Sequence, residues 1–377
     1  MENPLSVLES VRRSRNSRIQ SGRTGWIGID IGTGAIKIAQ VERTAGRFRI
    51  ARSVIVHAPE GFRYDHTSLE DGHISEEIRN AISLHGGFIG RAAACVVSMS
   101  LCELRTLTSA RGSEDEQREL ISLELQQDAS HAAEPREFDF WDVASASQDE
   151  GMDTTQVHVV SVPRSLADSV GTTLLDSKLR GDRLDVVPFC ALRAAEMDGT
   201  SVTTDMASSR TCVMLDWGYS VATVVVIRNG RPVLARCLRE CGLSRLFRRI
   251  TDRLKLTHIQ TDTLLMNYGI RRNRNRDTEA DELRDLIAEL AFPLLHDLTE
   301  ELTQTLEFLK MQYAGGSPVE LVVCGGGGAV PGVAQHLEAT LRIPVRAWRL
   351  PLRSADLDQP EPILANAAAL SVLAWEQ

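Results

Sequence analysis

The sequence predicts an α/β fold of two lobes that repeat one sheet-building motif. The chain has 377 residues, more than a single hydrophobic core usually holds, so two domains are expected. An apolar strand that ends in Asp-x-Gly and is followed by two more strands occurs near residue 26 and again near residue 211. A third glycine turn, between a strand and a helix, lies at 325–328. This order predicts an internal duplication of one sheet unit.

Composition excludes several classes of protein. Apolar residues make up 43% and charged residues 25% of the chain, which is ordinary for a globular protein. The net charge of -9 argues against bulk electrostatic binding of nucleic acid. No apolar run has the length needed to cross a bilayer, and the N-terminus lacks the apolar core of a secretory signal. The seven cysteines, without CxxC spacing, predict reduced, mostly buried thiols of a cytosolic protein.

The first part of the chain predicts a flexible basic tail at 1–24 and a first lobe at 25–200. Isoleucine- and valine-rich strands at 26–56 turn at 45–46, and a helix at 74–87 leads to a buried strand at 92–100. An inserted small subdomain is expected at about 106–183. Its helix begins at the N-cap Ser113 and carries acidic residues in the first turn.

The second lobe is expected at 209–377, after a polar boundary at 198–210. Its sheet core would comprise 209–245 and 316–360, with a helical subdomain at about 246–315. A long helix at 277–313 should bend or break near Pro293. A small, alanine-rich helix at 362–376 should pack back on the first lobe. The arginine-rich segments at 244–256 and 269–277 are typical of a solvated helix face and a surface loop.

The three glycine turns carry the candidate chemistry. Asp30 and Asp216 end matching strands, and from facing lobes they could hold one hydrated Mg²⁺. Thr33 and the backbone after Gly32 could cradle a phosphate, while Lys37 neutralises its charge. Alternatively, the two aspartates cap neighbouring amides and Lys37 is a surface charge.

The third turn has no charged residue. The glycine backbone at 325–328 could contact the flat base or the ribose of a ligand. Alternatively, these glycines allow the helix to pack closely on the strand. It lacks the Gly-Lys-Ser/Thr of a Walker A loop and the spaced glycines of a dinucleotide fold.

This order of turns resembles the actin/Hsp70/sugar-kinase ATPase fold, which consists of two duplicated ribonuclease-H-like domains. Within it, the chain resembles the type IV pilus assembly protein PilM family, relatives of the cell-division protein FtsA. The segments that carry the resemblance are "GIDIGTGAIKIAQVER", "HAPEGFRYDHTSLEDGHISEEIRNAI", "EDEQRELISLELQQD", "GRPVLARCL" and "CGGGGAVPGVAQHLEATLRIPV".

The resemblance implies a site for ATP or ADP with Mg²⁺ between the lobes. Mg²⁺ would be held through water by Asp30 and Asp216. The implied nucleotide-binding residues are Asp30, Gly32, Thr33, Gly34, Lys37, Asp216, Gly218, Tyr219, Ser220, Asp262, Gly325, Gly326 and Gly327.

The resemblance also implies a scaffold at the inner face of the cytoplasmic membrane. It would bind the N-terminal cytoplasmic peptide of a PilN-like inner-membrane protein and link it to pilus or secretion motor components. Membrane association would be peripheral, through that partner, and a homo-oligomer is possible. No nucleic-acid partner is implied.

Three departures from the family pattern predict a weak ATPase at most. Ala35 replaces a serine of the first turn, Trp217 is bulky beside phosphates unless it points into the core, and Leu265 replaces a lysine that touches the nucleotide. Losing such a hydrogen bond costs about 1–3 kcal/mol. Asp262 would partly replace the family's glutamate.

Other functions stay open. One is a nucleotide-free adaptor of the same machine. Another is the cytoplasmic part of the type II secretion L component, which normally continues into a transmembrane helix. A metabolic kinase of the superfamily needs an aspartate base at the cleft floor, and neither Asp142 nor Asp185 is well placed for it.

Overall fold

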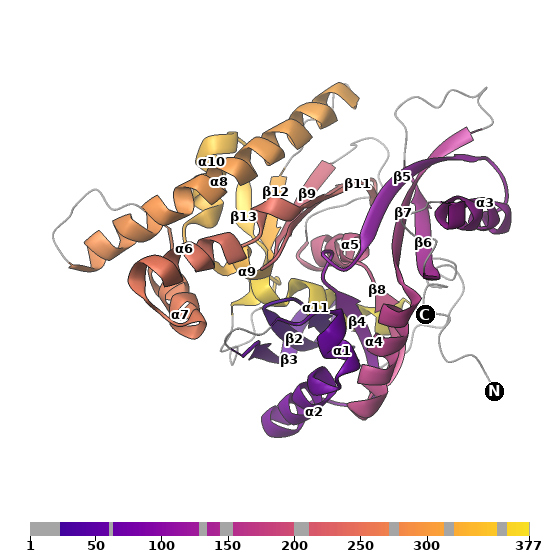
Figure 1. Ribbon diagram of the computed structural model, residues 1–377, viewed down its shortest axis with the longest axis horizontal. Helices are drawn as coiled ribbons and strands as arrows, with labels where there is room; N and C mark the ends of the chain where they lie inside the picture. The colour runs from indigo at the N-terminus through magenta and orange to yellow at the C-terminus, as the bar shows by residue number, and fades with distance from the viewer. Residues whose placement is uncertain are drawn as a thin grey trace.

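The computed structural model describes residues 23–59, 63–127, 134–143, 154–199, 211–270, 279–312, 320–352 and 360–376. Almost all of the expected tail at 1–24 and most of the boundary at 198–210 lie outside these ranges. Two five-stranded sheets form the body, and a three-stranded sheet is inserted into the first (Figure 1). We call each five-stranded sheet with its helices the first and the second lobe.

The first sheet has the order β3-β2-β1-β4-β8. β1, β2 and β3 are antiparallel neighbours, whereas β4 and β8 run parallel to β1. Ala45 and Gly46 turn the β2–β3 hairpin with positive φ angles of 49° and 76°, which suit a tight two-residue turn. The strands are β1 (Thr24–Ile31), β2 (Ala35–Thr44), β3 (Arg47–His57), β4 (Ala92–Val97) and β8 (Arg180–Asp185).

The second sheet repeats this arrangement as β11-β10-β9-β12-β13. Again three antiparallel strands are followed by two parallel ones. The predicted duplication within an α/β fold is therefore confirmed. The strands are β9 (Thr211–Trp217), β10 (Ala222–Arg228), β11 (Arg231–Leu238), β12 (Glu320–Cys324) and β13 (Val345–Ala347).

The inserted subdomain is a three-stranded sheet with one helix against it. Its order is β5-β7-β6, and α3 packs on one face through Ile121 and Leu125. The elements are β5 (Glu103–Ala110), α3 (Glu114–Gln127), β6 (Arg136–Asp142) and β7 (Thr154–Pro163). β8 pairs with β4 of the first sheet, so the sheet of the insertion ends before the expected limit of 183.

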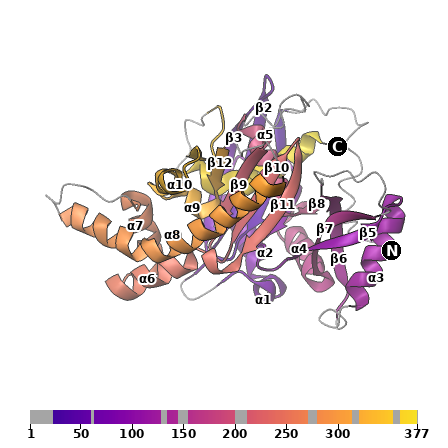
Figure 2. The ribbon, with the colours of Figure 1, turned by 90° about the horizontal axis from the view of Figure 1, so that it is seen from above.

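The remaining helices cover the two large sheets. α6 and α7 lie at the end of the molecule opposite the insertion, and α8 runs from that end toward the middle (Figures 1 and 2). α8 runs through Pro293 as one helix, so the expected break there is wrong, while the alternative of a bend stays a prediction. The helices are α1 (His66–Glu70), α2 (His73–His85), α4 (Arg164–Asp176), α5 (Val187–Met197), α6 (Ser244–Leu254), α7 (His258–Tyr268), α8 (Glu279–Gln312), α9 (Gly325–Ala329), α10 (Val333–Leu341) and α11 (Ala365–Ser371).

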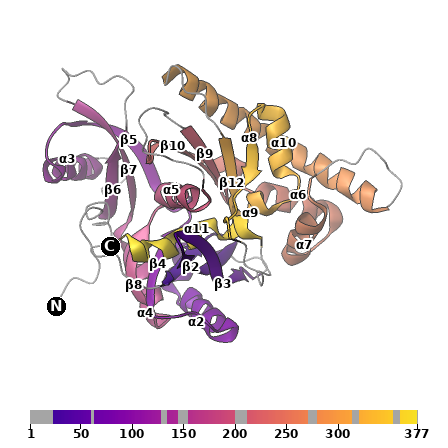
Figure 3. The same ribbon diagram turned by 180° about the vertical axis from the view of Figure 1, so that it is seen from behind.

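Two helices join the lobes. α5 contacts β9, β10 and β11 of the second sheet as well as α11, and α11 packs against β1, β2 and β4 of the first (Figure 3). Gly28 allows that packing, because a Cβ at this position would lie 1.9 Å from the carbonyl oxygen of Ala367. All seven cysteines are free thiols, and only Cys237 is not fully buried.

Candidate functional site

The two Asp-x-Gly turns open onto one shared cavity between the lobes, with a volume of about 90 Å³. Asp30 and Asp216 both line it, as do glycines from all three turns. The implied nucleotide-binding residues on its wall are Asp30, Gly32, Thr33, Gly34, Lys37, Asp216, Gly218, Tyr219, Asp262, Gly325 and Gly326.

Strand register brings Lys37 to Asp30. The two residues are directly opposite each other on the antiparallel strands β1 and β2. Lys37 Nζ lies 3.2 Å from Asp30 Oδ2, and the two side chains are only 15% and 9% exposed. A tight turn after the aspartate therefore places one partly buried cation beside one buried carboxylate.

Asp216 ends β9 and receives a hydrogen bond that sequence reasoning missed. Asn366 Nδ2, on α11, donates to Asp216 Oδ2 at 3.0 Å. Burial raises the pKa of the Asp216 carboxyl to about 6, and the negative charge of Asp30 adds to the shift. The hydrogen bond from Asn366 and the charge of Lys37 oppose it. A cation between the two carboxylates would relieve this repulsion.

The first and second turns touch each other across the cavity. The hydroxyl oxygens of Thr33 and Ser220 are 2.5 Å apart and share a hydrogen bond. A Cβ on Gly34 would lie 2.8 Å from the Tyr219 ring, so this glycine permits the close approach. Ser220 is thus directed at Thr33, and the lobes are closed on each other.

The third turn forms the short helix α9. Gly325 has a φ of 71°, and a Cβ there would lie 2.4 Å from Asp216 Oδ1. Gly327 packs on the indole of Trp217, where a Cβ would meet the ring at 2.3 Å, and it does not line the cavity. Trp217 is 1% exposed, and its indole nitrogen donates to the Cys241 carbonyl oxygen at 2.7 Å. Its bulk therefore fills the core beneath the turn.

One face of α7 forms another wall, through His258, Asp262 and Met266. These residues are four apart and share a helix face. Leu265 is fully buried in the core of the second lobe and does not line the cavity. Burial raises the pKa of the Asp262 carboxyl, and the nearby His57 lowers it. Position 265 therefore packs the core in this chain and does not face the cavity.

Several polar atoms at the cavity have no hydrogen-bond partner within the described ranges. They are Asn366 Oδ1 and both ring nitrogens of His258. Asn366 is 6% exposed, and an unsatisfied buried polar atom costs about 1–3 kcal/mol. The cavity wall thus combines a lysine, the carboxylates of Asp30 and Asp216, and polar atoms without partners in the described part of the chain. This combination fits an anionic ligand that is bound together with a cation. A polar residue among the alanines of this helix was the only sequence signal for Asn366.

The two aspartates considered as kinase bases lie elsewhere. Asp185 forms a buried ion pair with Arg193, with 2.7 Å between Oδ2 and Nη1. Asp142 is exposed at the end of β6. Neither lines the cavity.

A protein-family model described as type IV pilus assembly protein PilM matches residues 28–353. The chain belongs to this family. Among curated proteins, none matches it in sequence. No helix in the described ranges has both the length and the apolar character to span a bilayer.

Solved structures show the same fold for this PilM-family chain. A chain of the PilM-PilN type IV pilus biogenesis complex superposes with a TM-score of 0.74 at 21% identity, covering 94% of this chain and 100% of that one. The ethanolamine utilization protein EutJ from Carboxydothermus hydrogenoformans gives 0.53 at 13% identity, covering 94% and 92%. Together with the duplicated sheets, these matches identify the actin-like ATPase fold.

Proposed function

We propose that the protein is an actin-like, nucleotide-binding scaffold of a type IV pilus or related type II secretion assembly platform. One observation carries the nucleotide part of this proposal. Asp30 and Asp216, from matching strand ends of two lobes, line a single cavity together with Lys37 and bare glycine backbone. A polyphosphate with a divalent cation complements that combination of charges.

Different residues on the cavity wall would bind different parts of the expected ligand. Lys37 and the backbone at 32–34 and 218–220 would hold ATP or ADP phosphates, and Asp30 and Asp216 would hold hydrated Mg²⁺. Bound Mg²⁺ would neutralise phosphate charge. Gly325, Gly326 and Asp262 border the place for the nucleoside. Ligand pockets usually exceed about 300 Å³, so the lobes must part at the Thr33–Ser220 contact to admit a nucleotide.

Calorimetric titration of the full chain with Mg-ATP and Mg-ADP tests the nucleotide site. Asp30→Asn should weaken binding at least tenfold, because a carboxylate for the cation is lost. The matched control is Asp252→Asn, at an exposed position of α6 outside the cavity. Equal affinities for the two variants would contradict the assignment.

A nucleotide-free adaptor is the second candidate, and the internal pairing of the site favours it. Lys37 pairs with Asp30, Asn366 donates to Asp216, and Thr33 bonds to Ser220, so these side chains satisfy one another within the chain. This candidate predicts no heat of binding for either nucleotide and full binding of the partner peptide.

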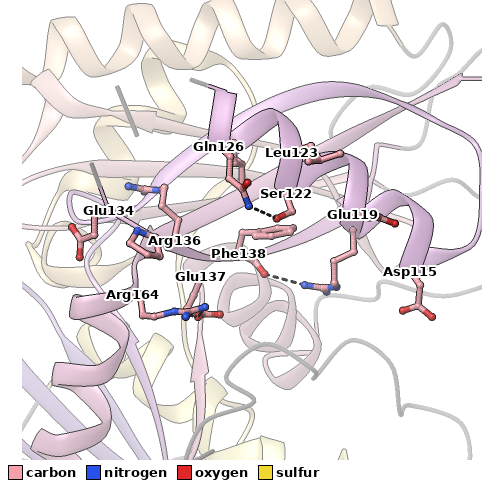
Figure 4. Close-up of a pocket in the computed structure, with 13 residues that line it drawn as sticks. Asp115, Glu119, Ser122, Leu123, Gln126, Glu134, Arg136, Glu137, Phe138 and Arg164 are labelled. Atoms are coloured by element: carbon pink, nitrogen blue, oxygen red, sulfur yellow. Dashed lines mark hydrogen bonds and ion pairs between the residues drawn. The ribbon is translucent and has the colours of Figure 1, made fainter. Parts of the chain in front are cut away.

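For the scaffold role we propose a specific surface, a groove on the inserted subdomain between α3 and the edge strand β6 (Figure 4). Its volume is about 880 Å³. The occupant we propose is the N-terminal cytoplasmic peptide of a PilN-like inner-membrane protein, because the similar solved structure is a PilM-PilN complex. The groove is lined by Asp115, Arg118, Glu119, Ser122, Leu123, Leu125, Gln126, Glu134, Pro135, Arg136, Glu137, Phe138 and Arg164.

Most charges in this groove are already paired. Arg118 binds Asp139 at 2.9 Å, and Arg164 binds Glu137 at 2.7 Å. Leu123 is 49% exposed on the groove side of α3. An edge strand offers backbone groups to an extended peptide, and an exposed leucine offers it apolar contact.

Fluorescence anisotropy with a labelled peptide from such a tail tests the groove. Leu123→Asp should weaken binding at least tenfold by removing apolar contact and placing a charge there. Leu84→Asp is the control, since Leu84 is 83% exposed on α2, outside the groove. Loss of binding in both variants, or in neither, would argue against this surface.

The partner would also bring the chain to the cytoplasmic face of the inner membrane and to the motor components. Flotation with vesicles that carry the anchored partner tail should recover the protein, and bare vesicles should not. A homo-oligomer on the platform is part of the same proposal, with light scattering as its measurement.

A further inference from the structure

β3 is the outer strand of the first sheet, beside β2 (Figure 3). It is also the longest strand of that sheet, with 11 residues. Within the described ranges β3 pairs with β2 alone, so its other edge has no strand beside it there. The backbone groups along such an edge can pair with an added strand. The edge of β3 is therefore a candidate surface for an extended peptide.

A bulge in β3 places three arginines on one face of the sheet. Strand residues two apart share a face, and opposite residues of paired strands point the same way. Ala51 has no opposite residue on β2, so Arg52 points to the same face as Arg49 although it lies three positions further on. Arg47 shares this face as well. The residues opposite Arg47, Arg49 and Arg52 on β2 are Thr44, Glu42 and Gln40.

The arginines give this face an excess of positive charge. Arg49 Nη2 lies 2.6 Å from Glu42 Oε2. Arg47 and Arg52 are exposed, and neither forms an ion pair with a residue in the described part of the chain. Arg52 Nη1 instead donates to the carbonyl oxygen of Ala51 at 2.6 Å. One glutamate therefore stands against three arginines.

An apolar side chain is held beside these arginines. The amide of Gln40, opposite Arg52, bonds twice to the backbone of Ile89. Its Nε2 donates to the Ile89 carbonyl oxygen at 2.7 Å, and the Ile89 amide donates to its Oε1 at 2.8 Å. A Cβ on Gly87 would lie 2.4 Å from Arg52 Nε, so this loop packs against the arginine. Ile89 itself is 63% exposed and offers apolar contact next to the positive charges.

We propose that the edge of β3 binds an extended, acidic segment of a partner protein. The segment would add a strand beside β3 and direct carboxylates at Arg47, Arg49 and Arg52. Backbone hydrogen bonds of an added strand supply affinity, and its alternate side chains supply specificity. Hydrogen bonds between guanidinium and carboxylate groups are charge-assisted and therefore strong.

The charge on this face also argues against a second copy of the chain as the occupant. Pairing of two copies through β3 would add further arginines to a surface that is already positive, and like charges on neighbouring strands are destabilising. Arg47, Arg49, Arg52 and Ile89 line neither the nucleotide cavity nor the groove on the inserted subdomain. The inference therefore does not depend on the function proposed for those two sites.

Fluorescence anisotropy of the full chain with a labelled, end-blocked peptide of alternating valine and glutamate tests this surface. The double variant Arg47→Glu, Arg52→Glu should weaken binding at least tenfold. It should also gain affinity for the matching valine–lysine peptide, a result that a misfolded variant would not give. The control is the double variant Arg248→Glu, Arg253→Glu, at exposed positions of α6, which should change affinity less than threefold.

Methylated peptides separate strand pairing from simple charge attraction. In an extended valine–glutamate peptide the valine amides point to one edge and the glutamate amides to the other. Methylating the amide nitrogens that face β3 should weaken binding at least tenfold, whereas methylating the other set should change it less than threefold. Full binding by both methylated peptides would reject an added strand.

Three other results would overturn the proposal. They are absence of peptide binding by the unmodified protein, equal losses in the two double variants, and binding to phosphatidylglycerol vesicles that depends on Arg47 and Arg52 while the peptide does not bind. The last result would assign the surface to an anionic membrane. Loss of Mg-ATP binding or of groove binding, with this peptide still bound, would reject those sites and leave the edge of β3 standing.

Discussion

The carboxyl of Asp216 has a pKa of about 6 because burial and the neighbouring charge of Asp30 both oppose its ionisation. A divalent cation binds the ionised form. Its binding therefore becomes stronger as pH rises through the pKa, and weaker as pH falls below it.

We predict that affinity for Mg-nucleotide rises about tenfold between pH 5 and pH 7, since the ionised fraction changes by about that factor across a pKa of about 6. Asp216→Asn cannot ionise, so its binding should be weak and lack this step. Titrations of both proteins at matched ionic strength measure the difference. The same pH profile for the two proteins would show that Asp216 does not hold the cation.

Also at the residue scale, the packing of Trp217 and Leu265 accounts for two of the departures from the family pattern. Trp217 fills the core under Gly327 and does not line the cavity. Leu265 is fully buried in the core of the second lobe and does not line the cavity. The sequence could not settle either orientation, because a side chain's direction at a strand end or on a helix depends on the elements packed against it.

At the scale of elements, α11 connects the start of the chain to the site. It lies so close to β1 that Gly28 touches the Ala367 carbonyl, and Ser371 Oγ donates to the Trp26 carbonyl oxygen. From this position Asn366 reaches Asp216. The helix therefore packs on the first lobe while it orients a carboxylate of the second.

We predict that Gly28→Ala lowers the free energy of unfolding by about 1–3 kcal/mol, because the added Cβ must push α11 off the sheet. Gly326→Ala is the control, since its Cβ would meet the flexible tip of Leu243 at 3.2 Å and the Trp217 carbonyl oxygen at an ordinary contact distance of 3.9 Å. Denaturant unfolding of both variants measures the change. A loss for Gly28→Ala no larger than for the control would mean that the contact is not tight in solution.

At the scale of the whole molecule, the Thr33–Ser220 hydrogen bond holds the two lobes together over the cavity. A partly buried hydrogen bond of this kind contributes about 0.5–1.5 kcal/mol. Removing it should favour open arrangements of the lobes.

We predict that Ser220→Ala increases hydrogen exchange of the backbone at 32–35 by about fivefold, the factor for roughly 1 kcal/mol of easier opening. Thr263→Ala, which removes an exposed hydroxyl on α7, should leave this exchange unchanged. Exchange followed by mass spectrometry reports the difference. Unchanged exchange in Ser220→Ala would show that the contact does not restrain the lobes.

The sequence by itself determined the repeated sheet units and the cross-strand placement of Lys37 beside Asp30. Both follow from short-range patterns: strands of β-branched residues, a glycine turn, and the fixed register of a hairpin. Only the tertiary structure decided that Asn366 and His258 join the cavity, that α8 continues through Pro293, and that the turns close on each other. These features depend on packing between segments distant in sequence, for which a linear pattern carries no signal.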